Sequence, residues 1–90
     1  MLHTYRKKTT IKAERFDGSE KMIKEYDILD GLRIGYGIYY SGIYRLPTKE
    51  GDMNISIGDW IATGVEGEHW VIADDIFHKT YERCDWWTTY

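Results

Sequence analysis

The sequence predicts an α+β fold, in which one short N-terminal helix packs on a strongly bent antiparallel β-sheet that forms a small barrel or half-barrel. Three observations lead to this prediction. The chain has 90 residues, the size of one domain covering residues 1–90. One segment near the N-terminus repeats apolar residues at helical spacing, and the remainder alternates apolar and polar residues between glycines. Because open strand edges invite aggregation, a bent sheet with the helix on one side is favoured.

The N-terminal third is expected to hold one strand and the helix. Apolar and charged residues alternate over residues 9–16, which is typical of a half-buried strand. Ser19 is a good N-cap, and the apolar stripe that follows predicts a helix over about 20–29. Gly31 is expected to end this helix, because glycine readily takes the left-handed conformation found after helices.

The rest of the chain is expected to be β-structure, because its short alternating runs are separated by glycine-rich turns. Strands are predicted over residues 34–40, 43–46, 53–57, 60–63, 69–72 and, as an edge strand, 78–84. Turns are predicted at Ser41-Gly42, after Pro47, at Gly58-Asp59 and over residues 64–67. Residues 73–77 can form a single helical turn, and an aromatic tail closes the chain.

The charge and cysteine content narrow the class of protein. Net charge is −3, with a single basic cluster at Arg6-Lys7-Lys8, which disfavours nucleic acid as a partner. A lone Cys84 excludes an intrachain disulfide and suits a reducing cytoplasm. No apolar run reaches the ~18–20 residues of a membrane span, and the charged N-terminus lacks the apolar segment of a signal peptide. We therefore expect a cytoplasmic protein that does not contact membranes.

Aromatic residues make up 16% of the chain, with eight Tyr and four Trp. Because both side chains carry a polar group, many are expected to lie half-buried at a rim or a subunit interface. This favours homo-oligomerisation or stacking on a ligand. Trp86, Trp87 and Tyr90 are expected to pack either on the chain's own sheet or on a neighbouring molecule, and the sequence leaves both alternatives open.

The glycine loop at residues 63–67 is the best candidate for a binding site. Its glycines allow backbone N–H groups to converge on an anion, while nearby tryptophans stack on a nucleobase. A plain β-turn is the alternative, and Glu66 and Glu68 would repel a phosphate. The predicted ligand-binding set comprises Arg6, Arg15, Arg45, Trp60, Thr63, Gly64, Gly67, His69 and Trp70.

The remaining polar residues show no catalytic or metal-binding pattern. Acids and histidines near the C-terminus match no zinc-site spacing, and adjacent aspartates are more typical of helix caps and turns. No Ser/His/Asp or Cys/His arrangement stands out, and Cys84 has only Arg83 beside it to lower its pKa. We therefore expect no enzyme, no metal and no cofactor.

Several blocks of sequence resemble a widespread group of small phage and prophage proteins. They are Tyr5-Arg6-Lys7-Lys8 with Ile11-x-Ala13, Thr48-x-Glu50-Gly51-Asp52-Met53, Gly58-Asp59-Trp60-Ile61-x-Thr63-Gly64-Val65-x-Gly67-Glu68, and Asp75-Ile76-Phe77-x-Lys79-Thr80-Tyr81-Glu82. The resemblance covers nearly the whole chain and implies a phage origin and one fold unit, not a particular chemistry. Residues 69–74 depart from the family pattern, as does Thr9, which replaces a proline. The departure puts in doubt the shape and ligand preference of the loop after Glu68.

Two function hypotheses follow. The leading one is a non-catalytic phage protein that binds and sequesters a small nucleotide-derived immune signal in the host cytoplasm, as a homo-oligomer. It rests on small size, aromatic excess, the glycine loop and scattered arginines, and on analogy of role with unrelated small phage proteins. The alternative is a protein–protein interaction module that inhibits a host defence enzyme or serves as an accessory phage factor. A nucleotide-cleaving enzyme has the least support.

Overall fold

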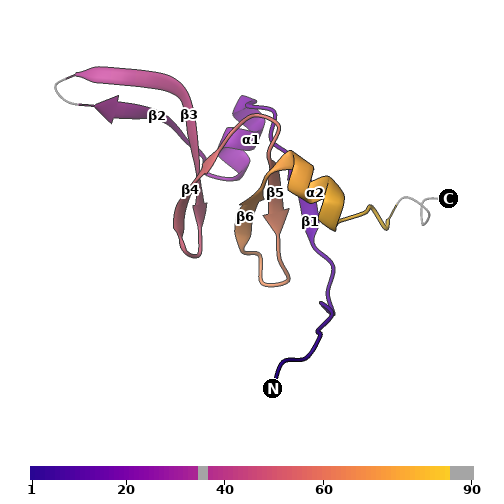
Figure 1. Ribbon diagram of the computed structural model, residues 1–90. Helices are drawn as coiled ribbons and strands as arrows, with labels where there is room; N and C mark the ends of the chain where they lie inside the picture. Colours follow the sequence, from indigo (N-terminus) through magenta and orange to yellow (C-terminus); the bar gives the residue numbers. More distant parts are fainter. Residues whose placement is uncertain (35–36, 86–90) are drawn as a thin grey trace.

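The computed structural model describes residues 1–34 and 37–85, without the side chains of residues 32–34 (Figure 1). Its elements are β1 (Lys12–Arg15), α1 (Glu20–Glu25), β2 (Leu29–Ile34), β3 (Ile38–Thr48), β4 (Gly51–Ile55), β5 (Trp60–Thr63), β6 (His69–Ile72) and α2 (Asp74–Thr80). The strands form two antiparallel sheets of three. Sheet A has the order β1-β5-β6, and sheet B has the order β2-β3-β4.

The predicted single bent sheet, closed into a barrel or half-barrel with one helix, is wrong. The described strands form two separate sheets and no closed barrel, and a second helix follows the last strand. The reason lies in β3, which continues through Pro47 and pairs with β4 only over its last five residues, 44–48. The rest of β3 pairs with β2 alone, so sheet B extends outward where a barrel would have to curl back.

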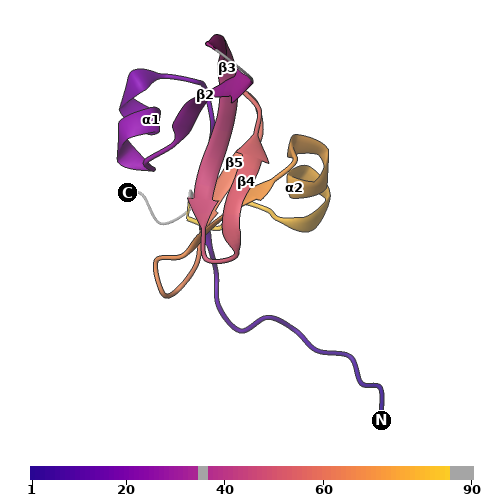
Figure 2. The same ribbon diagram turned by 90° about the vertical axis from the view of Figure 1, so that its left-hand side faces the viewer.

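The core lies between the inner faces of the two sheets and α1. Ser19 caps α1 as predicted, since its side-chain oxygen accepts the Met22 N–H at 3.2 Å. Met22 is the buried residue of α1. The core cluster is Phe16, Met22, Ile28, Leu46, Ile55 and Ile61. Figure 2 shows α1 and α2 on opposite sides of the strands, so sheet A has a layer on each face.

α1 ends earlier than predicted, and Gly31 does not end it. Asp27 takes the left-handed conformation instead (φ 55°), and the Ile28 N–H donates to the Ile23 carbonyl at 2.9 Å, which closes the helix. Gly31 lies within β2 under the ring of Tyr39, where an added Cβ would lie 2.2 Å from the tyrosine hydroxyl oxygen. This glycine therefore makes room for an aromatic ring.

The predicted turn at Ser41-Gly42 is also wrong, because both residues lie inside β3. Gly42 has a φ of 79° and donates its N–H to the Asp30 carboxylate at 2.9 Å. The ladder between β2 and β3 shifts register next to Asp30, so the glycine marks a β-bulge. The chain reverses nearer the tip, since Ile34 pairs with Ile38.

The strands predicted over 60–63 and 69–72 are confirmed as β5 and β6. In contrast, the edge strand predicted over 78–84 is wrong, because α2 occupies its first part. The single turn expected at 73–77 is the start of this longer helix, which Phe77 holds against the sheet by stacking on Trp60. Charges that suit the helix dipole lie in its first and last turns, at Asp74, Asp75, His78 and Lys79.

The N-terminal lead-in before β1 and residues 81–85 after α2 extend from this body (Figure 1). So does the ribbon, by which we mean β2 together with residues 38–43 of β3. The radius of gyration is 16.0 Å, compared with about 12 Å for a compact domain of this length. The ribbon therefore lies outside the layers that bury the core.

Candidate functional site

The predicted stacking residue Trp60 is covered by the chain itself. Its ring stacks on Phe77 with centroids 4.0 Å apart and an interplanar angle of 9°. Its indole N–H donates to the Asp74 carboxylate at 2.8 Å. Arg15, another predicted ligand-binding residue, lies on the same face, with Nε 3.2 Å from the Gly58 carbonyl and 3.8 Å from Asp74. These two residues therefore hold α2 on sheet A.

The electrostatics of this contact depend on Asp74. The hydrogen bond from Trp60 lowers the pKa of the Asp74 carboxyl, and the nearby His78 and Arg15 lower it further. The Nε2 atom of His78 lies 3.2 Å from the carboxylate. Asp74, at the beginning of α2, therefore contacts the Trp60 indole, the Arg15 guanidinium and the His78 ring.

The glycine loop uses its own N–H groups. Gly64 donates to the Glu68 carbonyl at 2.9 Å, and Gly67 donates to the Gly64 carbonyl at 3.0 Å. The Glu66 N–H donates to the Glu68 carboxylate at 3.2 Å. A Cβ at Gly64 would lie 1.8 Å from this carboxylate, so the glycine gives space to Glu68. The loop thus has the bonding of a hairpin turn, with a carboxylate where an anion would have to bind.

His69 and Trp70 point to opposite faces of sheet A, as successive residues of a strand do. The Nδ1 atom of His69 lies 2.9 Å from the Thr63 hydroxyl, and its ring meets the edge of Tyr26 at 5.1 Å. Burial and a hydrogen bond to Glu14 raise the pKa of the Tyr26 hydroxyl above its ordinary value. On the other face, Lys7 Nζ lies 5.3 Å from the centre of the Trp70 ring.

A groove of about 690 Å³ brings together three of the predicted residues: Thr63, Gly64 and Gly67. Its other wall is the lead-in to β1, with the two cations Lys8 and Lys12. The remaining lining residues are Thr9, Thr10, Ile11 and Val65. The predicted arginines do not line this groove.

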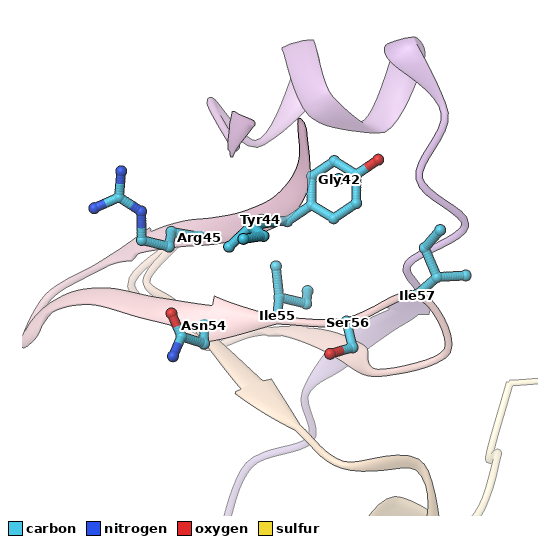
Figure 3. A pocket seen from close by; sticks show the side chains of 8 residues that line it. Gly42, Tyr44, Arg45, Asn54, Ile55, Ser56 and Ile57 are labelled. Atoms are coloured by element: carbon cyan, nitrogen blue, oxygen red, sulfur yellow. The ribbon is translucent and has the colours of Figure 1, made fainter. Parts of the chain in front are cut away.

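A second depression, of about 490 Å³, lies where β4 separates from β3 (Figure 3). It is lined by residues 42–45 and 54–57. Arg45 belongs to it, and its buried Nε has no hydrogen-bond partner among the described residues. Figure 3 shows the guanidinium of Arg45 extending away from Tyr44 and Ile57. The predicted ligand-binding residues thus fall at three or more separate places, and the structure does not gather them into one pocket.

The edge of β3 beyond this depression is a surface that the sequence reasoning did not single out as a site. Residues 38–40 pair with β2 on one side and residues 41–43 form the bulge, whereas β4 pairs only with residues 44–48 on the other side. We call residues 38–43 on the side away from β2 the open edge. Ile38, Tyr39 and Tyr40 are 52%, 56% and 50% exposed. Residues 34–44 contain no charged side chain, and this absence was the signal in the sequence.

An uncharged open edge of this length is unusual in a monomer. Natural proteins protect edge strands with lysines, prolines, bulges or a covering element, because exposed N–H and C=O groups recruit another strand. Within the part of the chain that the structure describes, the bulge at Gly42 is the one such device on residues 38–43. The open edge can therefore accept an extended polypeptide by backbone hydrogen bonding.

No protein-family model, curated protein or solved structure matches this chain. The resemblance to phage proteins stays a prediction. Among the described residues, no three His, Cys, Asp or Glu side chains come together to hold a metal ion, and no helix there has the length and apolar content to cross a membrane. Cys84 is exposed. The aromatic tail at 86–90 lies outside the described residues, so the alternatives for its packing stay open.

Proposed function

We propose that this chain is a non-catalytic protein–protein interaction module, which binds an extended segment of a polypeptide at the open edge of β3. The observation that carries the proposal is the edge of β3 over residues 38–43, which is uncharged and which no described strand pairs on the side away from β2. In the phage setting that the sequence resemblance implies, such a module would inhibit a host defence enzyme or act as an accessory phage factor in the host cytoplasm.

The chemistry of the open edge supports strand addition over other modes of binding. Backbone N–H and C=O groups give affinity for any extended segment, while side chains at alternate positions provide contacts that select a sequence. Tyr40 and Ile38 offer apolar and aromatic contact, and the depression at residues 42–45 and 54–57 can receive a side chain at the end of the bound strand.

A photo-crosslinking amino acid at position 40 tests the proposal in host cells. We expect a discrete protein adduct at this position. We expect none when the crosslinker replaces Val65, which is 78% exposed in the turn between β5 and β6. The adduct should disappear when Ile43→Asp places a charge on the edge, and should persist with Val65→Asp. Equal labelling at positions 40 and 65 would refute strand addition, and so would an adduct whose yield is unchanged by Ile43→Asp.

Sequestration of a nucleotide-derived signal is a second candidate, and the groove between residues 8–12 and 63–67 favours it. Its lysines and threonines suit a phosphate, and Lys7 and Trp70 lie nearby. A mixed nucleotide panel incubated with the protein tests it. Sequestration predicts that one free nucleotide is lost from solution and returns intact after the protein is heat-denatured. The double variant Lys8→Ala/Lys12→Ala should no longer deplete this nucleotide. Conversion to a new species would reveal an enzyme, and no depletion would reject this candidate.

A further inference from the structure

We infer that the polypeptide bound at the open edge is a second copy of this chain, paired antiparallel with residues 38–43 of the first about a twofold axis. The inference rests on the proposed function, since it names the partner of the same surface. Twofold symmetry makes such an interface self-complementary, with the same residues contributed by both copies.

The charge pattern favours a second copy over a foreign peptide. In a twofold antiparallel pairing the segment faces itself, so that any charge near its centre would meet its own like charge. Residues 34–44 carry none, while the chain as a whole has a net charge of −3 that keeps other surfaces of two copies apart. The nearest charge beyond this segment in β3 is Arg45. In the pair the two Arg45 residues would lie at opposite ends.

The position of β4 fixes where the second copy can bind. β4 occupies this side of β3 from Tyr44 onward, so an added strand has space only as far as Ile43. Because directly opposed residues of an antiparallel pair point to the same face, the twofold axis must pass through one residue. Centring it on Tyr40 places Ile38 of the second copy opposite Gly42 of the first. This pairing brings the tip of each ribbon to the depression of the other, next to Ile57, which is 63% exposed. Each depression would thus be completed by the other copy.

The exposed area matches a weak dimer. Ile38, Tyr39, Tyr40 and Ile43 are 52%, 56%, 50% and 39% exposed. Given that a large side chain buries ~150–250 Å², these fractions amount to roughly 300–500 Å² per copy. The total of roughly 600–1,000 Å² reaches the lower limit for a specific interface, ~1,000 Å², only at its upper end. We therefore expect a concentration-dependent dimer with a Kd on the order of micromolar to hundreds of micromolar.

Sedimentation velocity on the full chain, from about 1 μM to about 1 mM to bracket this Kd, tests the inference. The wild-type protein should shift from monomer to dimer across this range. Tyr40→Lys and Tyr40→Glu should each weaken dimerisation at least about tenfold, because like charges meet near the axis. An equimolar mixture of the two variants should restore the dimer, which a mere folding defect would not do. Val65→Lys is the matched control and should dimerise like the wild type.

The results of sedimentation and crosslinking together distinguish failure of the dimer from failure of the proposed interaction module. A wild-type chain that stays monomeric at all concentrations, or charge variants whose mixture does not recover, would overturn the second copy as the partner. If crosslinking at position 40 then still captures a host protein in an Ile43-dependent manner, the interaction module stands without the dimer. If position 40 gives no specific adduct either, both fail.

Discussion

The body and the ribbon use aromatic residues in opposite ways. In the body, the half-buried Trp60 stacks on Phe77 and is hydrogen-bonded to Asp74, because α2 folds back over sheet A. In the ribbon, Tyr39 and Tyr40 remain about half exposed, because no described element covers the strands. Aromatic content alone therefore does not locate a binding surface. Aromatic side chains stay exposed where the chain supplies no second layer of structure to cover them.

The difference extends to how each region is held together. The body has side chains from two sheets and two helices in contact, whereas the ribbon depends on its own ladder and on local contacts. Tyr39 is an example, since it lies over Gly31 and donates its hydroxyl to the Asp30 carbonyl at 2.8 Å. A two-stranded ribbon without a packed layer is only marginally stable in water. We therefore expect substitutions in the two regions to affect stability very differently.

The largest expected difference is between two isoleucines. Ile61 is fully buried in the core and Ile38 is 52% exposed on the ribbon. Ile61→Ala should lower the free energy of unfolding by about 2–5 kcal/mol, through lost burial and the cavity left behind. Ile38→Ala should change it by less than about 0.5 kcal/mol in the monomer. Urea denaturation at low protein concentration measures both, and similar losses would contradict the division into body and ribbon.

A smaller effect is expected at the contact between α2 and sheet A. Phe77→Ala removes the stack on Trp60 and a second one on Tyr81, whose ring centroid is 5.5 Å away. We expect a loss of about 1–2 kcal/mol, with a red shift of tryptophan fluorescence as Trp60 becomes exposed. Ile76→Ala is the matched control on the same helix, because Ile76 is 50% exposed. A thermal melt in which both variants lose equally would argue against α2 as the layer that covers Trp60.

The smallest expected effect is a dependence on pH. Because the pKa of Asp74 is lower in the folded chain than in the unfolded one, its carboxylate stabilises the fold fully above the ordinary aspartate pKa of about 4. That contribution is lost as the pH falls through the lower folded pKa. Asp74→Asn should therefore have a lower Tm than the wild type near neutral pH, and the gap should close below about pH 4. Asp75→Asn removes a charge from the same helical turn without touching Trp60, so the difference between its Tm and that of the wild type near neutral pH should be smaller than for Asp74→Asn.

Local sequence signals correctly predicted the parts of the fold that depend on one capping residue or on a hairpin between neighbouring strands. Ser19 caps α1, and β5 and β6 cover the predicted ranges. Errors arose where one residue type serves several purposes. Glycine can end a helix, make a turn, form a bulge or give space to a ring, and at Gly31 and Gly42 the partner is a residue distant in the sequence. A single sequence does not tell which of these contacts forms.

The candidate site was harder to predict for the same reason. Trp60 and the glycine loop have the composition of a ligand site, but a distant residue, Phe77, stacks on Trp60, and the side chain of the neighbouring Glu68 occupies the loop. The open edge depends on where β4 stops pairing with β3, which is a property of the register and not of any one residue. The missing charges over residues 34–44 were visible in the sequence. Their meaning became clear only once that register was known.

The pairing of β1 with β5 has a consequence for how the chain is made. Lys12 pairs with Thr63 and Arg15 with Trp60, so β1 has no partner until more than half the chain has been synthesised. Contacts between such distant segments form slowly, because a long loop must close before they are gained. The β5–β6 hairpin, by contrast, can form locally. During translation, β1 should leave the ribosome before β5 and β6 but reach its place in sheet A only after they have been made.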